Sequence, residues 1–198
     1  MSATAINQVN TIKRCVVENN QDYKRIYLIR HGECLSNITW PIENYSDASD
    51  TLTELGRTQA LASAVLLEGI FKGWKRVTGS ARLYSSTLTR ARQTAEIIHT
   101  HLSVPSSITF DSRLIEYGGE AEGKTSLKKR VSSVFSDLEN ADHDAIVVCH
   151  GHTMQALLGI CVDADHGNFV AQVNNGGICI FHKRFSETAS SSPCKSRD

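Results

Sequence analysis

Two histidines in this sequence each follow a largely apolar run, and each precedes a glycine. His31 comes after the run 25–29 together with Arg30, and His150 comes after the run 145–149. Both runs are rich in β-branched residues, so they predict buried strands. If both strands are central and parallel, the two histidines leave the sheet at the same edge and can face each other.

Two arginines could complete an anion site around these histidines. Arg30 and Arg90 carry forked guanidinium groups, whose paired donors suit phosphate oxygens. Arg90 stands in the first turn of a predicted helix, and the N-terminus of that helix should add a positive dipole end. A pocket with two histidines and two arginines would be repulsive unless a dianion occupied it. These residue types therefore indicate a phosphate monoester as the ligand.

Phosphoryl transfer through histidine requires a neutral imidazole as the nucleophile and an acid that protonates the leaving alkoxide. Glu116 is the candidate acid because it follows the apolar pair 114–115, and partial burial favours the protonated form of a carboxyl group. Glu120 and Glu122 are rivals for this role.

The elements that must position these groups alternate between strands and helices, which predicts an α/β fold. We expect a three-layer α/β/α arrangement around a mostly parallel central sheet. Further strands are predicted at 82–84, 108–110 and 177–181, and helices at 53–69 or 53–73, 88–102, 126–138 and 153–160. The polar segment 34–52 is predicted to be a loop without a regular element.

One domain is expected over residues 23–185. A polar N-terminal arm should precede it over residues 1–22, and a disordered Ser-rich tail should follow it over residues 186–198. The role of the arm is not evident from the sequence.

Composition excludes several classes of protein. Lys+Arg and Asp+Glu number 21 each, so no basic field favours nucleic acid as a partner. The apolar runs are shorter than the ~20 residues of a membrane-spanning helix, and no secretory signal is visible. Six cysteines without a Cys-x-x-Cys pair indicate a reduced, cytoplasmic protein. The sequence does not indicate an oligomeric state.

Several stretches, taken in order, resemble the motifs of the histidine phosphatase superfamily (phosphoglycerate mutase-like, branch 1). They are the segments 27–33 with Asn37, 52–60, 85–95, 113–116, 147–153 and 174–178. The resemblance covers about residues 24–182, and it implies a phosphoglycerate mutase-like fold and phosphoryl chemistry without a metal or another cofactor.

The resemblance also implies roles for individual residues. His31 would take up the phosphoryl group, and Arg30, Arg90 and His150 would bind and polarise it. Glu116 would be the proton donor. Substrate contacts are expected from Asn37, Gly151 and His152, although His152 could equally be a solvated histidine at the rim of the site.

Two departures from the family pattern favour a phosphatase over a mutase. His150 comes only 34 positions after Glu116, so much of the usual lid is missing, and the tryptophan-containing signatures of phosphoglycerate mutases are not found. A lid keeps water from a phosphoenzyme, so a shortened lid favours hydrolysis. A mutase and a phosphate-binding interaction module remain alternatives. The expected substrate is a phosphorylated small molecule or a phosphoprotein.

Metal and thiol chemistry have weaker support. His150 and His152 could form a metal pair, but no suitably spaced set of further ligands accompanies them, so no metal site is expected. Cys34 and Cys149 lie close in sequence to the two histidines. Packing is the favoured role for both, and the sequence leaves their redox sensitivity open.

Overall fold

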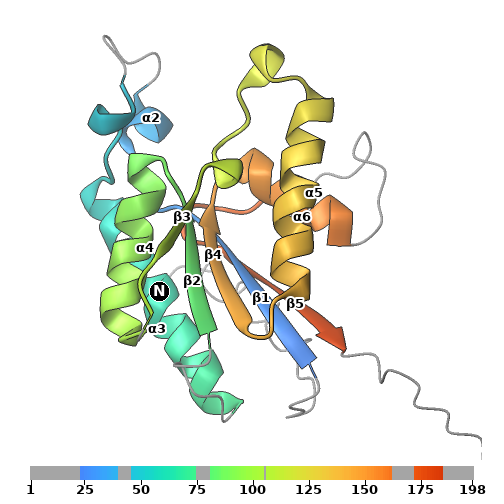
Figure 1. Ribbon diagram of the computed structural model, residues 1–198. Coiled ribbons are helices and arrows are strands. Elements are labelled where there is room, and N and C mark those ends of the chain that lie inside the picture. The colour runs from blue at the N-terminus through green and yellow to red at the C-terminus, as the bar shows by residue number, and fades with distance from the viewer. Residues whose placement is uncertain (1–22, 40–45, 75–80, 105, 162–171, 185–198) are drawn as a thin grey trace, which may run out of the picture.

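The computed structural model describes residues 23–39, 46–74, 81–104, 106–161 and 172–184 of the 198-residue chain. Within these residues the chain forms a five-stranded sheet flanked by helices (Figure 1). The strands are β1 (Tyr23–Arg30), β2 (Ala81–Ser86), β3 (Thr109–Asp111), β4 (Asp144–Cys149) and β5 (Ile178–Arg184). The α-helices are α2 (Leu35–Ile38), α3 (Glu54–Gly73), α4 (Thr89–Leu102), α5 (Lys124–Asn140) and α6 (Gly151–Cys161), and short 3-10 turns are η2 (Asp47–Ser49), η4 (Ser112–Leu114) and η5 (Gly119–Ala121).

The strand order is β3-β2-β4-β1-β5. The pairs β3–β2, β2–β4 and β4–β1 are parallel, whereas β5 runs antiparallel to β1 at the edge. The prediction of a mostly parallel α/β sheet is therefore confirmed. Because β1 and β4 are adjacent and parallel, their carboxyl ends meet at the same edge of the sheet.

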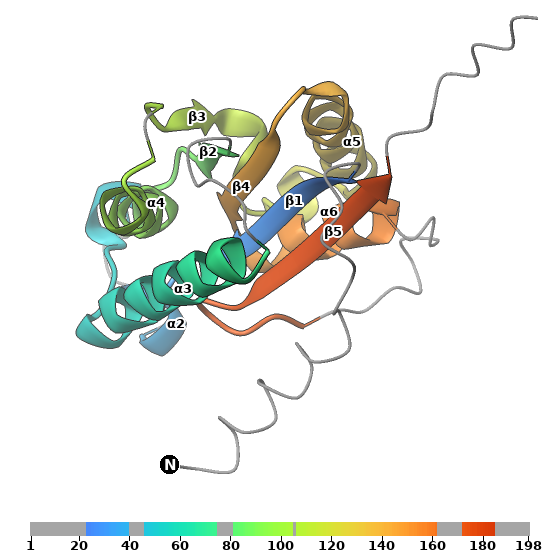
Figure 2. The ribbon, with the colours of Figure 1, turned by 90° about the horizontal axis from the view of Figure 1, so that it is seen from below.

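Helices cover both faces of the sheet, with α3 and α4 on one face and α5 and α6 on the other (Figure 2). Successive side chains of a strand point to opposite faces. Accordingly, Tyr27 and Ile29 of β1 pack with α3 and α4, while Ile26 and Leu28 pack with α5 and α6. Burial on both faces explains why β1 and β4 are nearly continuous apolar runs.

The apolar residues that recur at helical spacing in α4 and α5 are buried at nearly all positions. In the sequence, Leu88, Ala91, Ala95, Ile98 and Leu102 recur at three- and four-residue spacing, as do Leu127, Val131, Val134 and Leu138, and this spacing predicts one buried stripe on each of two helices. All of these residues except Leu88 lie on the buried faces of α4 and α5. Leu88 is only half-buried, and it precedes α4 as the N-cap residue rather than belonging to the helix. Thr53 caps α3, since its hydroxyl accepts a hydrogen bond from the Gly56 N–H.

Two predictions about local structure were wrong. The segment 34–52 was expected to be irregular, yet it contains α2 and η2, and a β-bridge between Cys34 and Leu52 joins its ends. The helix after His150 was predicted to begin at 153, but it begins two residues earlier, at Gly151, so residues 151–152 belong to its first turn.

The predicted N-terminal arm (1–22) and tail (186–198) lie outside the described residues. Across the part of the chain that the structure describes, every helix is too short or too polar to cross a bilayer.

Candidate functional site

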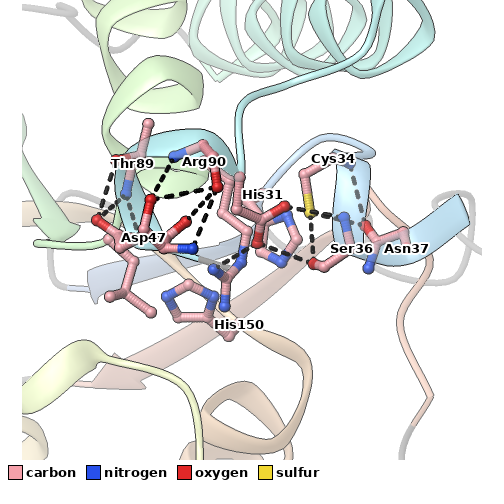
Figure 3. A network of polar contacts seen from close by, with 12 residues as sticks. His31, Cys34, Ser36, Asn37, Asp47, Thr89, Arg90 and His150 are labelled. Carbon is pink, nitrogen blue, oxygen red and sulfur yellow. Dashed lines mark hydrogen bonds and ion pairs between the residues drawn. The ribbon is translucent and has the colours of Figure 1, made fainter. Parts of the chain in front are cut away.

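The two predicted histidines meet at the carboxyl ends of β1 and β4. The backbone N–H of His31 donates to the backbone carbonyl of Cys149 at 3.0 Å, and this hydrogen bond joins the two strand ends. The imidazole rings of His31 and His150 lie with their centroids 5.0 Å apart (Figure 3). Both side chains are buried, His31 at 2% exposure and His150 at 0%. The predicted juxtaposition of the histidines is therefore found.

A backbone carbonyl fixes which nitrogen of His31 is available for chemistry. Nδ1 of His31 lies 2.7 Å from the Gly32 carbonyl oxygen. A carbonyl can only accept a hydrogen bond, so Nδ1 must carry the proton and Nε2 keeps its lone pair. Burial is the main cause that lowers the pKa of His31 to about 3, and the charges of Arg90 and Arg30 lower it further. The imidazole is therefore neutral near pH 7.

Glycines allow the chain to turn away from His31 at this point. A Cβ atom on Gly32 would lie only 2.2 Å from the Gly56 carbonyl oxygen, so a side chain there would collide with the backbone at the start of α3. The Gly32 N–H donates to the Thr94 hydroxyl of α4 at 3.1 Å. The loop that orients the His31 ring is thus fixed against both helices of one layer.

Asp50 holds Arg90 at the site, a role that the sequence did not reveal. Nη1 of Arg90 donates to Oδ2 of Asp50 at 3.0 Å, and both side chains are buried. The Ser36 backbone N–H and hydroxyl also donate to Asp50, at 2.9 and 2.8 Å. Burial alone would raise the pKa of Asp50, but these hydrogen bonds and the Arg90 charge lower it below its ordinary value. Arg90 is therefore anchored by an ionised carboxylate.

Asp47 occupies part of the first turn of α4, the helix whose N-terminus was predicted to add a positive dipole end. The Thr89 N–H donates to both carboxylate oxygens of Asp47, at 3.0 and 3.1 Å, and the Thr89 hydroxyl donates to Oδ2 at 2.9 Å. A carboxylate of the protein itself therefore takes the favourable position at the positive end of the helix. The guanidinium groups of Arg30 and Arg90 remain as positive charges beside the two histidines.

Two buried nitrogens beside the histidine pair have no acceptor among the described residues. Arg30 uses Nη1 to donate to the Val173 carbonyl at 2.7 Å, but its Nε has no partner. In His150, Nε2 lies 2.8 Å from the Ser86 hydroxyl, while Nδ1 has no partner. Burial, followed by the neighbouring His31 and the Arg90 charge, lowers the pKa of His150 well below its ordinary value. Unpaired donors in a buried site are costly unless a ligand supplies acceptors.

Glu116 reaches the site through the first turn of α6. Its Oε1 accepts the Tyr117 N–H at 2.8 Å and the His152 N–H at 3.2 Å. The side chain is 26% exposed, so it is partly buried as expected. The His152 ring lies outside, with its Nδ1 3.5 Å from the same carboxylate oxygen and its side chain 66% exposed. His152 therefore borders the candidate acid at the rim of the site.

Arg130 of α5 fixes the turn that carries Glu116. It binds both carboxylate oxygens of Glu122, and it donates to the backbone carbonyls of Arg113, Ile115 and Glu116. The hydrogen bond from Arg130 is the main cause that lowers the pKa of Glu122. Glu122 is therefore an ionised structural partner rather than the acid.

Asn37 and Gly151 have close structural surroundings. Oδ1 of Asn37 accepts hydrogen bonds from the Cys34 N–H at 3.2 Å and from Nδ2 of Asn175 at 3.0 Å. Asn175 also donates to the His31 carbonyl at 3.1 Å. A Cβ atom on Gly151 would lie 3.6 Å from Cζ of Arg30, an ordinary contact. Both predicted residues thus border the arginine–histidine cluster.

The neighbouring thiols are buried and protonated. Burial raises the pKa of both Cys34 and Cys149, which disfavours the reactive thiolate. Across the described ranges, no group of three or more His, Cys, Asp or Glu side chains is placed to hold a metal ion.

Asp50, Ser86 and Arg130 are the residues that sequence reasoning missed. Ser86 lies within the family-like segment 85–95 and Asp50 lies just before the segment 52–60, whereas Arg130 lies outside all of these segments. Each acts through a contact distant in sequence. Nothing in their types or spacing distinguishes them from ordinary loop, strand and helix residues.

Comparison with known proteins is consistent with this geometry. The model of the histidine phosphatase superfamily (branch 1) matches residues 26–128. The probable phosphoglycerate mutase GpmB of Escherichia coli is 34% identical over 166 residues, which covers 77% of this chain and 69% of that protein. GpmB of Salmonella paratyphi C is 31% identical over 162 residues, with the same coverage.

Solved structures share the fold at lower identity. Mycobacterial hydrolase 1 superimposes with a TM-score of 0.65 at 20% identity, covering 81% of this chain and 92% of that one. A mycobacterial glucosyl-3-phosphoglycerate phosphatase in complex with VO3 gives a TM-score of 0.62 at 20% identity, covering 79% and 90% of the two chains.

Proposed function

Since this chain belongs to the histidine phosphatase superfamily (branch 1), we propose that it hydrolyses phosphate monoesters through a phosphohistidine at His31, without a metal ion. The observation that carries the proposal is the hydrogen bond from Nδ1 of His31 to the Gly32 carbonyl. It leaves a neutral imidazole with a lone pair on Nε2, which is the form that phosphoryl transfer requires.

In the first step, Nε2 of His31 attacks the phosphorus atom. An N–P bond forms, the P–O bond to the alcohol breaks, and Glu116 protonates the departing oxygen. Oε1 of Glu116 already accepts two backbone N–H groups, so its transferable proton belongs on Oε2. Arg30, Arg90 and His150 donate to the phosphoryl oxygens and stabilise the charge that spreads over them in the transition state.

In the second step, water attacks the phosphohistidine and Glu116 accepts a proton from it. The N–P bond breaks, inorganic phosphate leaves, and His31 returns to its neutral form. Glu116 thus acts as an acid and then as a base, which restores its starting state after each turnover.

Hydrolysis is favoured over phosphoryl exchange by the short connection between the acid and the second histidine. From Glu116 to the start of β4, the chain forms only η5 and α5 with their joining turns. A mutase must exclude water while its intermediate reorients, and a covering segment does that. Mutase activity remains the second candidate because the matched GpmB proteins carry the name of a probable phosphoglycerate mutase.

The proposed substrate is a phosphorylated small molecule or a phosphorylated protein side chain, since the connection from Glu116 to β4 contains only η5 and α5 and no long covering segment. As part of the same proposal we place the protein in the cytoplasm. The four cysteines within the described ranges are free thiols, which supports a reducing compartment.

A phosphatase assay in the presence of EDTA tests the proposal, with wild type and His31→Ala compared on a panel of phosphate monoesters. Metal-independent release of phosphate that the variant loses is the expected result. Exchange between the two phosphoglycerates with little release would support the mutase. Absence of both activities, with phosphate still bound, would support an interaction module and overturn the proposal.

A further inference from the structure

Ser86 ends β2 and touches the second histidine of the site. Its hydroxyl oxygen lies 2.8 Å from Nε2 of His150, and the Leu88 N–H donates to the same oxygen at 3.2 Å. Both Ser86 and His150 are 0% exposed. Water therefore has no access to this contact, and its donors and acceptors must be matched within the protein.

Counting donors and acceptors decides which nitrogen of His150 carries the proton. If Nε2 carried it, Nε2 would donate to the Ser86 oxygen, and the Ser86 hydroxyl proton would have no acceptor among the described residues. Nδ1 would also be a buried lone pair without a donor. If Nδ1 carries the proton instead, the Ser86 hydroxyl donates to Nε2, and the unpaired Nδ1–H is the single group left over. The second arrangement leaves fewer unpaired polar groups and is therefore favoured.

The remaining unpaired group is what an anion site needs. Burial and the nearby positive charges keep His150 neutral, so it has one N–H to offer. An Nδ1–H beside the His31 ring can donate to a phosphoryl oxygen, whereas a bare Nδ1 would repel it. From this geometry we infer that Ser86 is a positioning residue that sets the tautomer of His150, so that Nδ1–H donates to the transferring phosphoryl group.

The two histidines would then share one tautomer but have opposite roles. The Gly32 carbonyl holds the proton on Nδ1 of His31 and frees the Nε2 lone pair for attack. The Ser86 hydroxyl holds the proton on Nδ1 of His150 and makes that atom the donor. This inference rests on the proposed function for its catalytic consequence, but the tautomer itself is a property of the resting protein.

The adjacent residue Ser85 offers a matched control. It is also a buried serine of β2 at 0% exposure, and its hydroxyl donates to the Ser86 carbonyl at 2.9 Å rather than to a histidine. Ser85→Ala therefore removes a buried hydroxyl one residue away without touching His150, whereas Ser86→Ala removes the proposed donor and Ser86→Thr retains a hydroxyl.

The test measures tautomers by long-range ¹H–¹⁵N correlation spectra of histidine-labelled protein at pH 7 without ligand, with His150→Asn used to assign the signal. Wild type, Ser85→Ala and Ser86→Thr should show Nδ1–H at His150, and Ser86→Ala should lose this preference. Affinity for inorganic phosphate should fall roughly 10-fold in Ser86→Ala alone, the scale of one hydrogen bond to a charged group. The turnover number should fall more than the KM rises, because this donor acts on developing charge.

The outcomes test the role of Ser86 and the proposed phosphatase activity separately. An Nε2–H tautomer in wild type, or an unchanged tautomer in folded Ser86→Ala, would overturn the inference even if the enzyme is an active phosphatase. The expected tautomers in a protein without phosphatase activity would retain the role of Ser86 but overturn the proposed function. If Ser86→Ala does not fold, the tautomer of His150 in wild type and in Ser86→Thr still tests the inference, because Nε2–H in either protein would overturn it.

Discussion

Lowering the pH should reduce the free energy of unfolding of this protein, because burial lowers the pKa of His31 in the folded state. In the folded protein the pKa of His31 lies at about 3, whereas its ordinary value is 6.5. Between these two values the unfolded chain binds a proton at this position and the folded protein does not. Stability contributed by the neutral His31 is therefore fully present above pH 6.5 and is lost as the pH falls towards 3.

The size of the effect follows from the gap between the two pKa values. One pKa unit corresponds to about 1.36 kcal/mol. Lowering the pH from 8 to 5 should therefore cost about 2 kcal/mol of unfolding free energy through His31, and the full gap would cost about 5 kcal/mol by pH 3. The lowered pKa of His150 should add a loss of the same sign.

The comparison that isolates His31 is between wild type and His31→Asn, which cannot titrate in this range. We expect the stability of the variant relative to wild type to rise by about 2 kcal/mol between pH 8 and pH 5. Urea unfolding at both pH values measures it, in buffers without phosphate because a bound anion would favour protonation of the imidazole. Contributions from carboxylates are common to both proteins and cancel in the difference.

Ser85→Ala is the control, because it changes a buried side chain without removing a titrating group. Its difference from wild type should be the same at both pH values. If the gap between wild type and His31→Asn also stays constant from pH 8 to pH 5, His31 is not held neutral by burial. The argument for a lone pair on Nε2 would then lose its basis.

Three further predictions concern the residues that support the site. Asp50→Asn should lower the free energy of unfolding by about 3–5 kcal/mol at pH 7 in urea titrations, because the buried ion pair between Asp50 and Arg90 is broken; added phosphate should reduce the loss. This difference should hold above the ordinary pKa of Asp50 and fade as the pH falls through its lower folded value. Glu116→Gln should slow hydrolysis of alkyl phosphates by about 10²–10⁴-fold in steady-state assays, with a much smaller effect on nitrophenyl phosphate, whose leaving group needs no proton. Arg130→Met should lower the turnover number on alkyl phosphates and also stability, by about 2–4 kcal/mol in urea unfolding, since three carbonyls lose a donor.

The strands that carry the histidines could be predicted because they are buried on both faces. Continuous apolar runs such as 145–149 leave few alternatives, and the α/β pattern favours parallel strands. That β1 and β4 are neighbours in the sheet is shown by the structure alone. The same logic gave the buried stripes of α4 and α5. Where burial on one or both faces of an element restricts its residues to apolar types, the element can be predicted from the sequence.

The segment 34–52 shows where this reasoning fails. The segment is mostly polar and has no regular spacing of apolar residues, so its sequence did not predict α2 or η2. Asp47 and Asp50 look like ordinary loop carboxylates, but one occupies the start of α4 and the other holds Arg90. Their roles depend on contacts with residues about 40 positions away, as in the 42-residue separation from Asp47 to Thr89. Such pairings follow from tertiary structure, which local residue types do not encode.

The chemistry of the histidines depends on something still less visible in the sequence, namely which atom each ring nitrogen faces. The proposed nucleophilic role of His31 depends on a ring that turns Nδ1 to the carbonyl of the next residue, and Gly32 itself lies against the Gly56 backbone, where a side chain would collide. At His150 the corresponding partner is a hydroxyl from another strand. Two histidines that each precede a glycine would thus differ in their proposed roles through one hydrogen bond each. Because each bond fixes a proton without adding a charge, the rings of the protein without ligand are neutral, and the arginines supply the positive charge that would face a phosphate dianion.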